Sequence, residues 1–199
     1  YIKYLEEKLK AKVIDFKFRD KSKSGWGLMG KVIFEKNGKV LERFVPPITS
    51  YYYQYFLKGD IYRENCYECK YACGNRVGDF TMGDFWIAAK AYPEIETKKG
   101  VSVLLVNSVK AIKLMEDLNK YFNFRKSNFE IAREQNDQLN RPTAKSSKRE
   151  AILKMWREGG YNAVAEEYYR VNKNAIRKYK IKMLVPLSIK KFFKKIIKK

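Results

Sequence analysis

The sequence contains no histidine. Neither a Ser-His-Asp type of catalytic triad nor a hydrolytic metal centre with imidazole ligands is therefore available. Long apolar stretches are also absent: no run of eighteen or more apolar residues occurs, which predicts a chain without a membrane-spanning helix. No signal peptide is visible either.

Cysteine is scarce, and all three cysteines lie within eight positions, at Cys66, Cys69 and Cys73. An odd count without secretory features argues against a disulfide framework and predicts a reducing, cytoplasmic location. The spacing C-x-x-C-x-x-x-C suits a metal ion or an iron–sulfur cluster, because short loops let thiolates converge on one centre. Three thiolates cannot complete a four-ligand cage, so a further ligand must come from an Asp, a partner chain or a missing segment. The alternative is three cysteines that are buried as small hydrophobic residues.

Acidic residues are few: the chain has 22 Asp and Glu against 43 Lys and Arg, which gives a formal net charge of +21. Residues 141–199 hold much of this excess. A charge of this size predicts attraction to an acidic partner, a nucleic acid, an anionic membrane surface or a phosphorylated cofactor. The segment Lys190–Lys199 alternates lysine pairs with Phe192, Phe193, Ile196 and Ile197. It predicts either an anchor on anionic lipid at the inner membrane face or an unstructured basic tail.

The pattern along the chain predicts an α/β (α+β) fold, with a mixed β-sheet flanked by helices and a basic helical C-terminal tail. Strands are expected at 13–18, 31–35, 40–44, 79–86 and 101–106, in one sheet, and a further short strand at 129–134. The apolar run 101–106 predicts a strand buried on both faces. Helices are expected at 1–10, 51–57, 108–121, 146–158, 161–171 and 174–183. We expect a domain at 1–140 and a separable extension at 141–199, which resembles a helix-turn-helix in outline.

Local signals support several of these elements. Asn37-Gly38 between two β-rich runs predicts a type I′ hairpin. Ser50 predicts a helix N-cap, and Gly159-Gly160 a helix stop. The tyrosines that follow Ser50 favour either a core cluster or a stacking surface for a cofactor ring. Arg19 and Lys21, at a strand end, either are solvated or meet a phosphate.

Several stretches carry a resemblance to a known family. The run C-Y-x-C-K-Y-A, followed by N-R-V-G-D-F-T-M-G-D-F-W, resembles the coenzyme F420 hydrogenase/dehydrogenase beta-subunit family, and in particular its bacterial members found near surface-polysaccharide genes. The segments Tyr1–Asp20 with Gly25-Trp26, and G-V-S-V-L-L-V-N-S at 100–108, look like further parts of the same family. The likeness covers about residues 1–135.

The resemblance implies an oxidoreductase that relays electrons between a [4Fe-4S] cluster and FAD. It implies cluster ligands among Cys66, Cys69 and Cys73, with Cys73 outside the family pattern. The implied FAD-binding residues are Arg76, Asp79, Thr81, Gly83, Asp84 and Trp86. From the residues themselves, Asp79 and Asp84 can equally be structural carboxylates. The implied partner is a redox protein or a ferredoxin-like N-terminal segment, which this sequence lacks, so we expect a fragment of a longer protein.

One departure from the family concerns its G-D-F-W-G motif, whose last residue is Ile87 here. A side chain at that point predicts a less close backbone approach to a flavin. Two other functions are left open: a non-catalytic accessory protein of polysaccharide assembly, and a charge-driven nucleic-acid binder.

Overall fold

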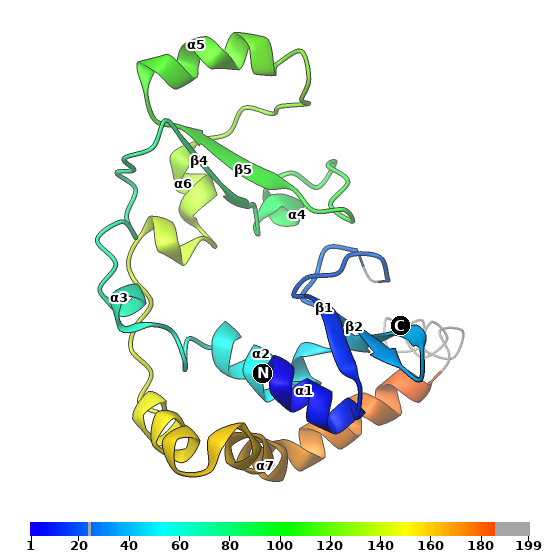
Figure 1. Ribbon diagram of the computed structural model, residues 1–199. Coiled ribbons are helices and arrows are strands. Elements are labelled where there is room, and N and C mark those ends of the chain that lie inside the picture. The colour runs from blue at the N-terminus through cyan, green and yellow to red at the C-terminus, as the bar shows by residue number, and fades with distance from the viewer. Residues whose placement is uncertain (24, 186–199) are drawn as a thin grey trace, which may run out of the picture. The chain divides into compact units, whose positions relative to one another are not determined.

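The computed structural model describes residues 1–23 and 25–185, so the predicted anchor Lys190–Lys199 lies outside the described residues. The described chain forms two compact units (Figure 1). Unit 1 comprises residues 1–19, 28–61 and the segment from 147 onward, and unit 2 comprises 20–27 and 62–146. No helix among the described residues is long and apolar enough to cross a membrane.

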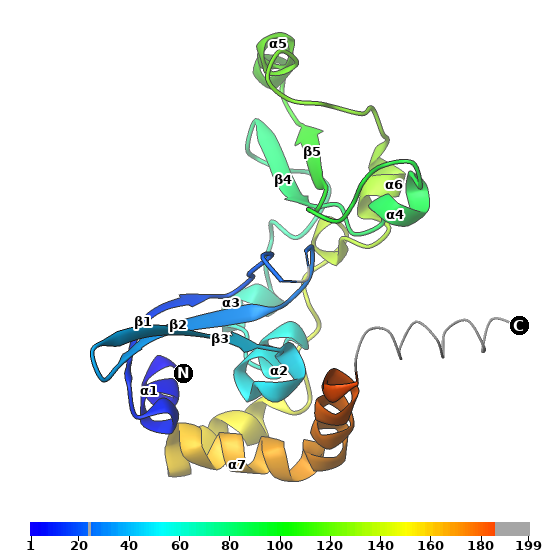
Figure 2. The same cartoon turned by 90° about the vertical axis from the view of Figure 1, so that its right-hand side faces the viewer.

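Unit 1 contains a three-stranded antiparallel sheet in the order β1-β2-β3, with helices on one side. Its elements are α1 (Ile2–Leu9), β1 (Lys12–Lys17), β2 (Gly30–Lys36), β3 (Lys39–Val45), η1 (Pro47–Thr49), α2 (Tyr51–Leu57) and α7 (Arg149–Leu184). Figure 2 shows α1 and α2 on one side of the sheet, with α7 on the far side of these helices.

Two local signals of unit 1 are confirmed. Asn37 and Gly38 both have positive φ, 53° and 71°, as the type I′ turn between β2 and β3 requires. The Ser50 hydroxyl accepts a hydrogen bond from the Tyr53 amide at 3.3 Å, so Ser50 caps α2. The sequence therefore specifies this hairpin and this helix start locally.

The tyrosines after Ser50 belong to the core. Tyr51 and Tyr53 are buried, and the ring of Tyr53 stacks on Phe18 with centroids 4.4 Å apart. Tyr51 packs edge-on against Tyr4 of α1. The core interpretation of this cluster is confirmed.

Residues 149–184 of the C-terminal segment form a helix, α7, and this helix is not separable from the core. Val164, Ala165 and Tyr168 of α7 are buried in the same cluster as Tyr4 and Tyr51. The expectation of a separable extension is wrong for these residues, because an apolar stripe at helical spacing runs beneath the basic side chains. The domain boundary between residues 1–140 and 141–199 is a separate expectation, and it stays a prediction.

The backbone of α7 departs from helical geometry at Gly160, where φ is 64° and ψ is −162°. The helix stop predicted at Gly159-Gly160 is therefore a kink within α7, and the positive φ of Gly160 is a conformation that favours glycine. The second expected break, between 171 and 174, is wrong because the helix continues through these residues. The helix-turn-helix outline therefore loses one of its turns.

Unit 2 contains a two-stranded antiparallel ribbon, β4 with β5, surrounded by short helices. Its elements are α3 (Glu64–Tyr67), β4 (Phe80–Asp84), α4 (Ala88–Ala91), β5 (Ser102–Val106), α5 (Val109–Leu118), α6 (Phe129–Arg133) and η2 (Asp137–Leu139). A small core of Phe85, Ile87 and Ala88 packs against Val101 and Val103 at the β5 end.

The α+β class is confirmed, but three details of the expected sheet are wrong. The strands divide between two antiparallel sheets rather than forming one mixed sheet. β5 is an edge strand whose residues are exposed or half-buried, because its only strand partner in the described chain is β4. The strand expected at 129–134 is helix α6, since the Asn128 side chain accepts a hydrogen bond from the Ile131 amide at 2.9 Å and caps it.

Candidate functional site

The β4–β5 ribbon presents one face that is almost free of bulky polar groups. Thr81 pairs with Leu105 and Gly83 with Val103, so these four residues share a face. A Cβ atom on Gly83 would meet only Val103 Cγ1, at 3.9 Å. Packing among the described residues therefore does not demand glycine there, and its absent side chain leaves the face open.

A hollow of about 230 Å³ lies on this part of the ribbon. It is lined by Arg76, Thr81, Met82, Gly83, Asp84, Trp86, Val103, Leu105, Asn136, Gln138 and Leu139. The structure thus brings together five of the six residues expected to bind a cofactor, and leaves out Asp79. Sequence reasoning missed the wall formed by residues 136–139, for which the sequence carries no signal beyond a polar, turn-prone run.

Arg76 places a cation at this hollow. Its Nη2 donates a hydrogen bond to the Gln138 carbonyl oxygen at 2.7 Å. Its Nε is buried and has no hydrogen-bond partner among the described residues. A buried donor without an acceptor is costly, and a planar guanidinium suits carboxylate, phosphate or carbonyl acceptors. Arg76 therefore brings positive charge to the hollow.

An aromatic pair forms another side of the site. Trp86 is 41% exposed and stacks on Trp26, with ring centroids 5.2 Å apart and planes 5° from parallel. The Trp26 ring is held in turn, because its Nε1 donates to Asp84 Oδ1 at 3.3 Å and its backbone amide donates to the Lys98 carbonyl at 2.7 Å. The pair is therefore a fixed, partly exposed flat surface.

Asp84 has at least one structural contact, through Trp26, although it also lines the hollow. Lys21 is structural as well, since its Nζ donates to the Lys99 carbonyl at 3.0 Å.

Ile87 stands where the G-D-F-W-G motif of the resembled family has its last glycine. It is 2% exposed and packs into the core of unit 2. It does not line the hollow. The departure at Ile87 thus places no side chain in the candidate site.

Asp79 takes a structural position at the start of α5. Its Oδ1 accepts a hydrogen bond from Ser108 Oγ at 2.5 Å, and Lys110 lies 3.4 Å from its Oδ2. These contacts lower the pKa of Asp79, with the Ser108 hydrogen bond as the larger cause. Ser108 also accepts from the Ala111 amide and caps α5. The carboxylate of Asp79 is therefore committed to this helix start.

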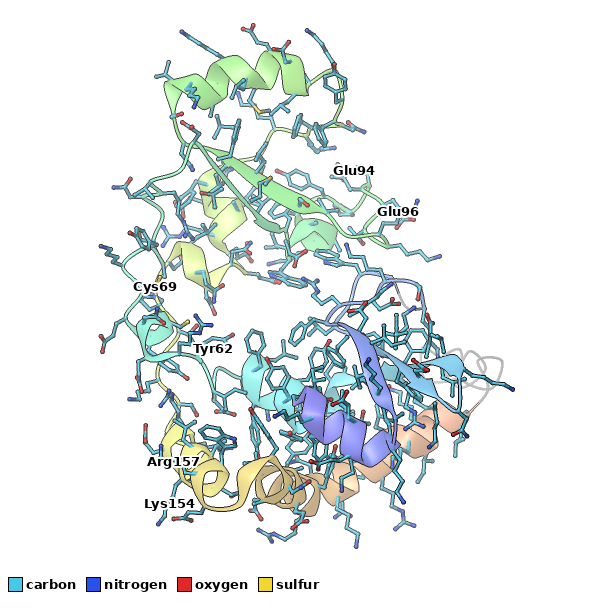
Figure 3. All side chains as sticks on the ribbon, in the orientation of Figure 1. Tyr62, Cys69, Glu94, Glu96, Lys154 and Arg157 are labelled. Carbon is cyan, nitrogen blue, oxygen red and sulfur yellow. The ribbon has the colours of Figure 1, made fainter. Side chains whose placement is uncertain are left out.

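The three cysteines lie along α3 and the loop after it (Figure 3 labels Cys69). All are free thiols; Cys66 is exposed, and the other two are half-buried. Cys73 Sγ lies 3.2 Å from the Asn75 carbonyl oxygen. The interpretation of Cys66 as a buried filler is therefore wrong.

A complete cluster site does not fit the described residues. Among residues 1–23 and 25–185, no three Cys, Asp or Glu side chains gather closely enough to hold a metal ion. An iron–sulfur cluster needs four ligands, most often thiolates. Cys66 and Cys69 can supply two from one turn of chain, and the remaining ligands have to come from outside this arrangement.

We expect the native protein to react with a disulfide reagent such as dithionitrobenzoate, with Cys66 fastest because its thiol is exposed. The rate is followed by absorbance on wild type and on Cys66→Ser. The Ser variant should lose the fast phase and keep the slower ones. Thiols that react only after denaturant is added would contradict this exposure.

A family model that describes the C terminus of the beta subunit of coenzyme F420 hydrogenase/dehydrogenase matches residues 2–130. No curated protein matches the chain. No solved structure matches it either.

Proposed function

Because the chain belongs to the coenzyme F420 hydrogenase/dehydrogenase beta-subunit family, we propose that it is a redox domain that binds FAD at the hollow on the β4–β5 ribbon. The observation that carries the proposal is the gathering of Arg76, Thr81, Gly83, Asp84 and Trp86 around one hollow. A bound flavin would accept and release electrons there, while the protein binds and orients it.

The lining suits a flat ring with polar edges. Val103 and Leu105 offer apolar contact, and Gly83 leaves room beside them. Trp86 supports stacking with an aromatic ring, and the guanidinium of Arg76 supplies positive charge for a phosphate or carbonyl group of the cofactor. At about 230 Å³ the hollow is smaller than the roughly 300–1,000 Å³ of usual ligand pockets. It would therefore enclose a part of the cofactor, with the rest on the protein surface.

For an iron–sulfur cluster, the described residues supply an incomplete ligand set. Cys66 and Cys69 would hold a cluster only together with ligands of another segment or chain. A role in polysaccharide biosynthesis stays a prediction.

The test is a titration of the full 199-residue chain with FAD, followed by tryptophan fluorescence quenching and confirmed by flavin absorbance after gel filtration. Wild type should retain FAD, and Trp86→Ala should weaken binding about 10-fold through the lost stacking. Arg76→Gln should weaken it by a similar factor, because a charge-assisted hydrogen bond is lost.

The matched control is Trp156→Ala. Trp156 of α7 is 42% exposed, like Trp86, but lies in unit 1. It should lower total fluorescence without changing the affinity. An equal loss of FAD affinity in Trp86→Ala and Trp156→Ala, or no retention of FAD by wild type, would contradict the proposal.

A further inference from the structure

The last part of α7 carries only positive charge. Between residues 171 and 184 it has five exposed cations and no acidic residue: Lys173, Arg177, Lys178, Lys180 and Lys182. Within the described part of the chain, Lys173, Arg177 and Lys180 make no ion pair. The sequence from 186 to 199 adds six lysines and again no acid. The five cations that α7 carries between residues 171 and 184 attract an extended anionic surface.

Apolar side chains are interspersed with these cations and face solvent. Ile181 is 54% exposed and Leu184 is 81% exposed. The end of α7 also borders a groove of about 450 Å³. Tyr169, Ile176, Ile181 and Leu184 line this groove together with Lys173, Arg177 and Lys180.

The three lining cations are spaced by four and three residues, which places them along one side of the helix. Cations beside exposed aliphatic groups suit a surface that is anionic at its boundary and apolar beneath it. That combination is the membrane–water interface. A nucleic acid would use the charges but leave Ile181 and Leu184 without apolar contact, and a second copy of this chain would meet like charge.

We propose that the end of α7, residues 169–184, is a docking surface for anionic lipid bilayers, on which the protein lies peripherally. This surface belongs to unit 1, whereas the proposed FAD site belongs to unit 2. The proposal therefore goes beyond the proposed function and does not depend on it. Lipid headgroup charge would be met by Lys173, Arg177 and Lys180, and the outer acyl region by Ile181 and Leu184.

The experiment measures co-sedimentation of the full chain with vesicles of phosphatidylcholine, with and without phosphatidylserine. Wild type should bind only the vesicles that contain phosphatidylserine. The triple variant Lys173→Gln, Arg177→Gln, Lys180→Gln should bind about 100-fold more weakly, since each basic residue contributes roughly a 5-fold factor at such a surface. The double variant Ile181→Ser, Leu184→Ser should also lose affinity at unchanged charge.

The matched control is Lys39→Gln, Lys113→Gln, Lys126→Gln, which removes three exposed cations elsewhere and leaves α7 intact. It should keep most of the affinity. Equal losses in the two triple variants would overturn the proposal, because charge alone would then explain binding. So would unchanged binding of the Ile181/Leu184 double variant, or tighter binding to a duplex oligonucleotide than to phosphatidylserine vesicles at the same salt concentration.

Discussion

Replacing Tyr53 with alanine is expected to lower the free energy of unfolding of unit 1 by about 3–5 kcal/mol, the usual range for a large aromatic side chain in a core. Tyr53 is fully buried and stacks on Phe18. Its ring also fills the space over Gly30, where an added Cβ atom would lie 2.8 Å from Tyr53 Cε2. Because domain stabilities are about 5–15 kcal/mol, this single change removes much of the total.

The conservative variant Tyr53→Phe separates packing from polarity. The Tyr53 hydroxyl is buried and has no hydrogen-bond partner among the described residues. Its removal should therefore be neutral or stabilise by about 1 kcal/mol. Urea unfolding monitored by circular dichroism measures both variants. A Phe variant as unstable as the Ala variant would show that the hydroxyl, and not the ring, is needed.

The second large effect is a loss of stability in alkali. Burial raises the pKa of Tyr168 to about 12, and the pKa values of Tyr1, Tyr4, Tyr51 and Tyr53 are also raised, chiefly by burial. A tyrosine whose pKa is raised in the folded state stabilises the fold fully below pH 10, its unfolded value. That contribution disappears as the pH rises from 10 towards 12. For Tyr168, which is 3% exposed, two pH units correspond to about 3 kcal/mol.

Urea midpoints measured between pH 8 and about 12 test this expectation. The urea midpoint of wild type should be constant from about pH 8 to about pH 10 and should fall steeply above about pH 10. Tyr168→Phe should be less stable than wild type at about pH 8, because the hydrogen bond from the Tyr168 hydroxyl to the Ile48 carbonyl (2.8 Å) is lost. The urea midpoint of this variant should then fall less steeply than that of wild type as the pH rises. Tyr121→Phe, at an exposed tyrosine, should follow wild type. Parallel curves for Tyr168→Phe and wild type would contradict the assignment.

Local signals predicted the elements they belong to. The Asn37-Gly38 turn, the Ser50 cap and the Gly160 kink each depend on backbone conformation within a few residues, so the sequence alone specifies them. The apolar run at 101–106 predicts a strand but not its position in a sheet, because a strand of a two-stranded ribbon can be as apolar as a central strand. Residues 129–133 form a helix because the Asn128 cap outweighs the β-preference of Phe129 and Ile131.

The candidate site was predictable only where a motif covered it. The resemblance pointed to five residues that line the hollow, whereas spacing alone left Asp84 ambiguous. Trp26 lies far before β4 in the chain, and the wall at 136–139 lies well after β5, so no periodic pattern links these positions to the motif. Asp79 matched the motif, but Ser108 and Lys110 engage its carboxylate.

The discontinuous make-up of unit 1 has a consequence for synthesis on the ribosome. The hydroxyls of Tyr168 and Tyr169 bond to the carbonyls of Ile48 and Thr49, 120 residues earlier. The N-terminal sheet and helices therefore emerge long before the helix that covers Tyr4 and Tyr51 exists. During this interval their aromatic face is open to water and to chaperones, and the closing step carries the entropy cost of a long loop. A chain released at residue 130, where the family match ends, would remain in that open condition.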